Sequence, residues 1–364
     1  MLTPPDESFT HQAPVPHSMV GSSDPSWRER YWVSLQDVAS GETVLSFGLG
    51  HYPNQDAQEA FVCLSHEGRQ HNLRLSRPLA PESHVMRVGP FSTDIVEPFQ
   101  RLRFALDENA SDISFELDWL GSFPPFLEDR HLETSGARVT HDLIRYIQVG
   151  RAEGHLRIGG HDLAVTPATW WGERDHSWGV RPLPRVEGSP PTARPEWSFL
   201  LFLPLQFEDF GFHLYLFEDR DGHATHRSCG LMEAGGAGRE HVARLAHDLV
   251  WETDAPTPTL VSGSLDVELR SGRRLAIDLT ALPGRAHLRG GGYGGVDGWF
   301  QGQWRDGETL THEVWDLSDR TRLRSWGAYS SDHLLRATCD GRVGFGISEY
   351  MVLPNHIRYG AVRG

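Results

Sequence analysis

Strand-length segments rich in β-branched and aromatic residues follow one another along the chain, with Gly, Pro, Asp or Asn at the breaks. In several of them apolar and polar residues alternate with a period of two, as in a strand with one buried and one solvated face. The breaks carry the residue types that turns require. The pattern therefore predicts antiparallel β-structure. In the first third of the chain the predicted strands are 28–37, 42–53, 59–68, 71–79, 100–109 and 112–121.

The rest of the chain predicts hairpins, each made of two such segments around a polar turn. Segment 144–165 is expected to turn near Glu153 and Gly154. The secondary structure of residues 238–252 is not decided by the sequence, since their pattern fits an α-helix or a strand equally well. The other predicted hairpins are 211–232 around Asp221 and Gly222, 263–282 around Ser271 and Gly272, and 333–353 around Asp340 and Gly341.

We therefore predict an all-β fold of many antiparallel strands in sandwiches or barrels, because turn signals recur roughly every 8–12 residues. The 364-residue chain is long enough for two such units. Residues 1–25, which are rich in proline and polar side chains, are expected to be disordered. The composition changes within 122–195, and we place the two β domains at 26–190 and 191–364.

The chain is acidic, with 34 basic and 49 acidic residues and a formal net charge of -15. Nucleic acid and anionic membranes are therefore not expected as partners. The N-terminal sequence lacks the basic and apolar regions of a secretory signal, and no segment has the roughly 18 apolar residues of a membrane span. The chain has three widely spaced cysteines, Cys63, Cys229 and Cys339. Such a sparse, odd set fits a reducing, cytoplasmic location, although the sequence does not exclude one disulfide.

Familiar catalytic and cofactor motifs are absent from the sequence. It contains no G-x-S-x-G, H-E-x-x-H, C-x-x-C or phosphate-loop motif. The chain has 20 histidines, but His223 and His226 are three residues apart and would lie on opposite faces of a strand. We therefore expect neither a metal nor a cofactor. Twelve tryptophans instead favour aromatic-lined surfaces or cavities.

The segment WWGERDHSWGVRP (170–182) is the strongest candidate for chemistry, because it places Asp175 and His176 between Trp171 and Trp178. A carboxyl group packed against indole is desolvated, which raises its pKa and suits it to donate a proton. Indole faces also stabilise positive charge, such as that of a carbocation. In an ideal strand, however, Asp175 and His176 point to opposite faces unless a bulge re-aims them.

Two arginines of the same segment define a structural alternative. If Arg174 or Arg181 lies against Asp175, its charge opposes the rise in the pKa of the carboxyl group. The segment would then be a rigid corner that braces two β units, and Asp175 would be an ion-paired structural residue.

A family resemblance adds to these observations. The sequence RDHSWGVR (174–181) resembles the D-H-x-W-G signature of lipocalin-like proteins related to carotenoid hydratase and to AttH, a group that also contains cyclases of the Diels–Alderase type. Residues 344–360 are similar to the closing segment of that family. The resemblance covers the chain from about residue 140 to the C-terminus. It implies two tandem lipocalin-like β-barrel domains with a hydrophobic cavity near their interface.

The resemblance also implies a site. In the hydratase an acidic residue of the motif protonates an isoprenoid double bond, and water captures the resulting cation. The matching residue is Asp175, with His176 beside it to tune or relay the proton. Trp171 and Trp178 would line the pocket. Polar residues near the similar motifs complete the expected substrate site: Tyr146, Arg174, Arg181 and Glu349.

Together these features favour a cofactor-independent hydratase, lyase or cyclase that acts on a hydrophobic isoprenoid- or polyketide-like small molecule. A non-catalytic carrier of such a molecule is the alternative, because a barrel lined by Trp and Phe is an apolar container. A carbohydrate-binding module is a third hypothesis, and it requires tryptophans on the surface.

Overall fold

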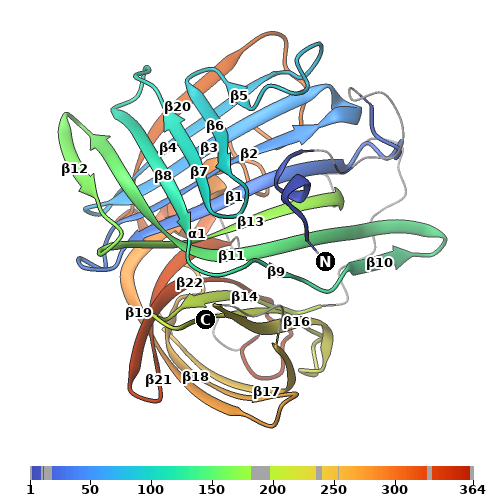
Figure 1. Cartoon of the computed structure of the whole chain (residues 1–364), viewed down its shortest axis with the longest axis vertical. Helices are drawn as coiled ribbons and strands as arrows, with labels where there is room; N and C mark the ends of the chain where they lie inside the picture. The colour runs from blue at the N-terminus through green and yellow to red at the C-terminus, as the bar shows by residue number, and fades with distance from the viewer. Residues whose placement is uncertain are drawn as a thin grey trace.

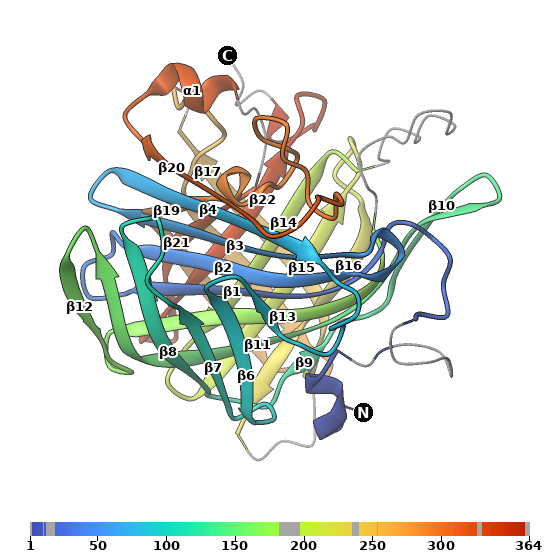
Figure 2. The same ribbon diagram turned by 90° about the horizontal axis from the view of Figure 1, so that it is seen from above.

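A computed structural model describes residues 2–9, 11, 19–181, 197–234, 240–252, 254–325 and 330–360. Within these residues the chain forms a curved 14-stranded sheet and a closed eight-stranded barrel, packed against each other (Figures 1 and 2). Neighbouring strands are antiparallel in both. The prediction of an all-β fold with two lipocalin-like β units is therefore confirmed.

The 14-stranded sheet, called the first sheet, curls around its own apolar core. Its main path runs β20-β4-β3-β2-β1-β13-β11-β8-β7-β6-β5, and β9, β10 and β12 pair with β11 beside this path. The strands are β1 (Trp27–Asp37), β2 (Val44–Tyr52), β3 (Ala57–His66), β4 (Arg69–Pro78), β5 (Arg87–Val88), β6 (Phe91–Glu97), β7 (Arg101–Leu106), β8 (Ile113–Gly121), β9 (Phe126–Leu127), β10 (His131–Ser135), β11 (Arg138–Ile158), β12 (His161–Val165), β13 (Trp170–Val180) and β20 (Thr309–Asp316).

The barrel closes in the order β14-β15-β16-β17-β18-β19-β21-β22. Its strands are β14 (Phe199–Gln206), β15 (Phe210–Glu218), β16 (Ala224–Glu233), β17 (Glu240–Trp251), β18 (Leu260–Leu269), β19 (Arg274–His287), β21 (Ser331–Cys339) and β22 (Arg342–Val352). The short helices of the described chain are η1 (Pro4–Glu7), η2 (Pro53–Gln55), η3 (Leu288–Gly291) and α1 (Arg320–Ser325).

The division of the chain between the two units is not linear. Strand β20 follows six barrel strands in the sequence, yet it pairs with β4 at the edge of the first sheet. The chain therefore leaves the barrel after β19, completes the first sheet and returns at β21. The predicted boundary at residues 190 and 191 lies outside the described residues.

Two sequence-based predictions of local structure need correction. Strand β11 continues through Glu153 and Gly154, and the chain turns instead at Gly159 and Gly160, which both have positive φ. Residues 240–251 form a strand, so the helical interpretation of 238–252 is wrong. The hairpins at Asp221, Ser271 and Asp340 are confirmed, and each turn contains a glycine with positive φ.

The N-terminal segment is also different from the prediction of disorder over residues 1–25. Residues 4–7 form the helix η1, and Glu7 is fully buried against the first sheet. Burial of a charged side chain requires a partner, and Arg174 supplies it with two hydrogen bonds of 2.8 Å. The described part of this segment is therefore ordered by one buried ion pair.

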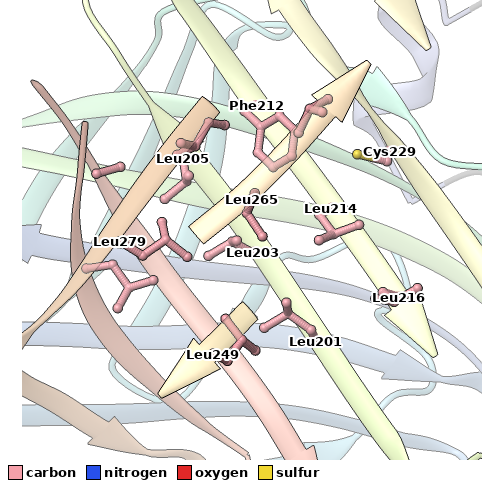
Figure 3. Close-up of a cluster of buried hydrophobic side chains, with 14 of the residues drawn as sticks. Leu201, Leu203, Leu205, Phe212, Leu214, Leu216, Cys229, Leu249, Leu265 and Leu279 are labelled. Carbon is pink, nitrogen blue, oxygen red and sulfur yellow. The ribbon is translucent and has the colours of Figure 1, made fainter. Parts of the chain in front are cut away.

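Three clusters of buried apolar side chains stabilise the two units and their contact. One fills the barrel, with Leu203, Phe212 and Leu265 among its members (Figure 3). A second fills the curl of the first sheet. A third joins the two units and includes Trp32 of β1 and Phe202 of β14, whose rings meet edge to face at 5.6 Å. The two units therefore share a buried interface.

Removing a central barrel side chain tests how much this core contributes to stability. We expect Leu203→Ala to lower the free energy of unfolding by about 2–5 kcal/mol, because Leu203 is fully buried and a cavity remains. Chemical denaturation measures the change. Val261→Ala on β18, where the side chain is 45 % exposed, is the matched control and should have little effect. An equally small loss for Leu203→Ala would show that the barrel collapses around the deletion.

All three cysteines lie in the described chain, and each is a buried free thiol. The disulfide left open by the sequence is therefore absent. Within the described residues, no helix has the length and apolar character needed to cross a lipid bilayer. Among the described tryptophans Trp304 is the exposed one, at 51 %, so within the described residues the structure does not show the several surface tryptophans that the carbohydrate-binding hypothesis requires.

Candidate functional site

Strand β13 lies in the middle of the first sheet, paired with β1 on one side and β11 on the other. Its side chains alternate between the interface face, which packs against the barrel, and the opposite inner face. Asp175 is on the interface face beside Arg145, whereas His176 is on the inner face beside Tyr146. The pairing of β13 continues through both residues without a register shift, so no bulge brings them together.

Asp175 is a buried carboxyl group at the junction of the two units. It is 6 % exposed, and one of its oxygens lies 3.5 Å from Arg145 Nη1. Burial raises the pKa of Asp175, while the charges of Arg145 and Arg181 oppose that rise. Arg145 also forms a shorter ion pair of 2.8 Å with Glu128 and packs over the ring of Tyr215. Asp175 therefore shares its cation with a closer carboxylate.

Glu128 links the first sheet to the barrel. Its carboxylate lies 2.8 Å from Arg145 on β11 and 2.7 Å from His213 Nε2 on β15. Burial acts to raise the pKa of Glu128, but the charge of Arg145 and the hydrogen bond from His213 lower it to about 2. Glu128 is therefore a fixed anion, in contrast to Asp175.

A second acid reaches the interface from the barrel. Burial raises the pKa of Glu349 on β22 to about 7, and the charge of Asp175 adds to this rise against the opposing charge of Arg145. Asp332 on β21 lies nearby, and burial together with the charge of Glu349 raises its pKa as well. Ser46 on β2 donates a hydrogen bond to Asp332 across the interface. The interface thus contains several carboxyl groups whose pKa values are raised.

Arg30 connects this acidic cluster to the segment that follows η3. It donates hydrogen bonds of 3.0 Å to the Tyr293 hydroxyl and to Gln301 Oε1. The charge of Asp175 contributes to a raised pKa of Arg30 in spite of burial. Arg30 also borders a cavity of about 10 Å³, which has room for about one water molecule.

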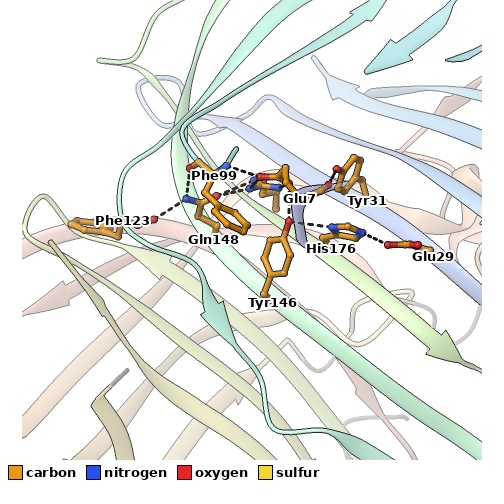
Figure 4. Close-up of polar contacts among 9 residues, drawn as sticks. Glu7, Glu29, Tyr31, Phe99, Phe123, Tyr146, Gln148 and His176 are labelled. Atoms are coloured by element: carbon orange, nitrogen blue, oxygen red, sulfur yellow. Dashed lines mark hydrogen bonds and ion pairs between the residues drawn. The ribbon is translucent and has the colours of Figure 1, made fainter. Parts of the chain in front are cut away.

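The inner face of the sheet carries a separate polar network (Figure 4). Arg174 donates hydrogen bonds to both oxygens of Glu7, and it also donates to Gln148 Oε1 at 2.6 and 3.1 Å. The amide of Gln148 in turn donates to the backbone oxygens of Phe99 and Phe123. This network ties the N-terminal segment to β11 and β13.

His176 belongs to the same inner-face network. Its Nδ1 lies 3.1 Å from the Tyr146 hydroxyl, and its Nε2 lies 2.8 Å from Glu29 Oε1. The Tyr146 hydroxyl donates to Glu7 at 2.7 Å. His11 Nδ1 approaches the same oxygen of Glu29 at 2.6 Å. His176 is therefore separated from the interface face by the thickness of the sheet.

The structure divides the predicted site residues into two groups. Asp175, Arg181 and Glu349 influence one another at the interface. The other predicted polar residues, Tyr146, Arg174 and His176, lie together on the inner face. The pairing of Asp175 with His176 as proton donor and relay is therefore corrected, because consecutive strand residues face opposite sides. Of the arginines offered as structural partners of Asp175, Arg174 pairs with Glu7 instead.

The predicted tryptophan walls of Asp175 also need correction. Trp178 lies on the inner face, where its ring stacks on His11 at 3.5 Å. Trp171 is four residues from Asp175, and its ring contacts Phe345 and the guanidinium of Arg151. The burial of Asp175 therefore comes from the barrel that covers it, not from the indoles of its own segment.

Sequence reasoning missed the residues that surround Asp175 in space. Arg145 lies in a segment that was correctly predicted as a strand, but only its pairing with β13 places it beside the carboxyl group. Glu128, Asp332 and Arg30 come from three other segments. The charge of Arg30 and Asp332 within apolar strands was the available signal, since buried ionic groups require partners, whereas Glu128 lies just after β9. The spacing of these residues in the sequence did not show which side chains would be their partners.

Comparison with known proteins identifies the family. The model of a family of unknown function, DUF8625, matches residues 2–362. The chain belongs to this family. A search of curated proteins finds no match to this DUF8625 member.

Solved structures with a similar fold also exist. The protein of Nitrosomonas europaea assigned as AttH is 14% identical, with a TM-score of 0.57, and the match covers 98% of this chain and 100% of that protein. Kievitone hydratase from Nectria haematococca is 13% identical, with a TM-score of 0.53 and coverage of 95% and 96%. At these identities the similarity establishes the fold, in agreement with the resemblance to AttH-like proteins.

Proposed function

We propose that this DUF8625 member is a cofactor-independent hydratase, lyase or cyclase for a hydrophobic isoprenoid- or polyketide-like small molecule. The observation that carries the proposal is the placement of two carboxyl groups from different units, the buried Asp175 and the half-buried Glu349, at the interface between sheet and barrel. Kievitone hydratase has the same fold, which supports a reaction of this class as a proposal.

The chemistry requires an acid that is protonated near neutral pH. In the proposed reaction Asp175 donates its proton to one carbon of a substrate double bond, which forms a C–H bond and leaves a carbocation on the other carbon. Water adds to the cation, and the proton that it releases returns to the Asp175 carboxylate. In a cyclase, a second double bond of the substrate attacks the cation, and a carbon-bound proton returns to the carboxylate instead.

The neighbours of Asp175 suit this cycle. The charge of Asp175 contributes to the raised pKa of Glu349, and burial raises the pKa of Asp175 itself, so both carboxyl groups take up a proton more readily than in water. Arg145, fixed by Glu128, stabilises the carboxylate that remains after proton transfer. Because Asp175, Arg145 and Glu128 are buried, the electrostatic interactions between them are stronger than in water.

A labelling experiment separates this proposal from a carrier. The ligand that co-purifies with the full chain is first identified by mass spectrometry, and related alkenes are then incubated with the protein in D₂O. The enzyme is expected to return a product with deuterium bound to carbon, because the proton donor exchanges with solvent. Recovery of every bound ligand unchanged and without deuterium would favour a carrier of hydrophobic molecules.

The raised pKa of Glu349 predicts a pH-dependent gain in stability for Glu349→Gln. A carboxyl group whose pKa rises from 4.5 unfolded to about 7 folded costs stability as the pH increases through that window, by about 3 kcal/mol above pH 7. The amide removes this cost, so the variant should gain stability over the native protein between pH 4.5 and 7. Urea denaturation at several pH values measures the difference. Glu308→Gln, at an exposed position, is the control, and a pH-independent effect of Glu349→Gln would contradict the prediction.

A further inference from the structure

A cluster of two histidines and one glutamate lies on the inner face, on the opposite side of the sheet from Asp175. His11 Nδ1 and His176 Nε2 both approach Glu29 Oε1, at 2.6 and 2.8 Å. Within the described residues this is the group whose donor atoms, all within 4.8 Å of one another, have the arrangement of metal ligands. The three residues come from the N-terminal segment, β1 and β13.

The outer hydrogen bonds of both imidazoles determine which nitrogen atoms face Glu29. Asp6 Oδ1 lies 3.2 Å from His11 Nε2, and a carboxylate can only accept, so His11 carries its proton on Nε2. Tyr146 donates its own proton to Glu7, so its oxygen accepts from His176 Nδ1. When both imidazoles are neutral, His11 Nδ1 and His176 Nε2 therefore carry no hydrogen and direct their lone pairs at Glu29.

Two lone pairs and one carboxylate oxygen directed at each other repel unless a positive charge lies between them. Glu7 is neutralised by Arg174, which leaves the charges of Asp6 and Glu29 to be balanced within this cluster. One added proton on each imidazole would supply that charge, and a single divalent cation between the three groups supplies it as well. Two imidazoles with one carboxylate are ligands typical of zinc and of non-haem iron.

We propose that His11 Nδ1, Glu29 Oε1 and His176 Nε2 bind one divalent transition-metal ion. Metal-bound histidines usually donate their other N–H to a carboxylate or another oxygen, and Asp6 and Tyr146 provide these acceptors. Tetrahedral ligands of zinc are about 3.3 Å apart, so the Glu29 oxygen must retreat from each ring by roughly half an ångström.

The surroundings fix both rings in this orientation. The Trp178 ring stacks on His11 with an interplanar angle of 10°, and the Phe9 ring lies 5.1 Å from His176. Three protein ligands leave a fourth position for water or another small ligand. The bound ion would clamp the N-terminal segment onto β1 and β13. The proposed metal ligands include neither Asp175 nor Glu349, so the metal site and the proposed enzymatic activity can be tested independently.

A similar cluster in the barrel, His247 and His356 around Glu218, has hydrogen-bond partners for both neutral imidazoles without a metal ion. His356 Nδ1 accepts the backbone N–H of Tyr359, so its Nε2–H donates to Glu218. His247 Nδ1 accepts from the Tyr359 hydroxyl, and its Nε2–H donates to the other oxygen of Glu218. Both imidazoles are satisfied while neutral. His247 is therefore a matched control histidine.

Calorimetric titration of the chelator-treated full chain with Zn²⁺ tests the proposal. The native protein is expected to bind one equivalent of Zn²⁺. His11→Ala, which removes a ligand on the N-terminal segment, should weaken binding by on the order of 100-fold or more, and Asp6→Asn by about 10–100-fold. His247→Gln should bind as the native protein does. Bound Co²⁺ should show the visible absorption of a site with histidine ligands, and His11→Ala should lose it.

Two outcomes overturn the proposal. One is the absence of stoichiometric Zn²⁺ binding by the native protein. The other is equal binding by the native protein, His11→Ala and Asp6→Asn, which would place the ion elsewhere. Asp6→Asn keeps all three ligands and changes a partly exposed side chain, so it reports on the site even where His11→Ala disturbs the N-terminal segment.

Discussion

Asp175→Asn is expected to lower kcat of the proposed reaction by about 10²–10⁴-fold, the usual contribution of a general acid. The amide has nearly the same shape as the carboxyl group but cannot release a proton to an alkene. Ligand binding should change little, because Arg145 keeps its closer partner Glu128. Steady-state kinetics and a titration of the bound ligand measure the two effects separately.

Asp118→Asn is the matched control for this prediction. Asp118 lies on β8 of the same sheet, is poorly exposed and pairs with Arg101 and Arg103, but it is not at the interface. Its replacement should leave kcat unchanged. Full turnover by Asp175→Asn would eliminate the general-acid role, and the same loss in both variants would point to an indirect effect on the sheet.

Glu7→Gln is expected to destabilise the protein by about 3–5 kcal/mol. The substitution leaves the Arg174 guanidinium buried without its counter-ion, and an uncompensated buried charge is far more costly than the loss of one hydrogen bond. The Tyr146 hydroxyl also loses a charged acceptor. Chemical denaturation at neutral pH measures the difference.

A double-mutant cycle makes this result specific. Replacing both partners in Glu7→Gln with Arg174→Met should restore much of the stability, because no buried charge then remains. Asp107→Asn, which breaks an exposed pair with Arg87, should change stability little. If Glu7→Gln behaves like the exposed control, the N-terminal segment does not contribute to the fold in solution.

The success of the strand predictions has a simple cause. Along β7 and β8, alternate residues such as Phe104 and Trp119 are buried while their neighbours are solvated, so the period of two is visible in the sequence. The failure at β11 has a cause too. Gly154 has positive φ and resembles a turn residue, yet it remains paired within a continuous strand, close to the backbone of Glu116.

The site was predicted in part. The sequence singled out Asp175 as a buried acid, and its burial and raised pKa agree with that hypothesis. It did not indicate Arg145 or Glu128, because their proximity to Asp175 depends on the pairing of β11 and on contact with the barrel. Nor did it indicate His11 and Glu29, since their approach to His176 depends on how the N-terminal segment folds back.

The sequence by itself determined many of the strands, three of the four predicted hairpin turns and the opposite orientation of Asp175 and His176, because these follow from local backbone geometry and a period of two. The tertiary structure alone decided what each of these residues faces. Packing of the barrel on one side of β13 buries Asp175 beside Glu349, and folding of the N-terminal segment onto the other side surrounds His176 with Tyr146 and Glu29. Such contacts join residues far apart in the chain, and the free energy that selects them comes from burial and charge pairing rather than from local sequence.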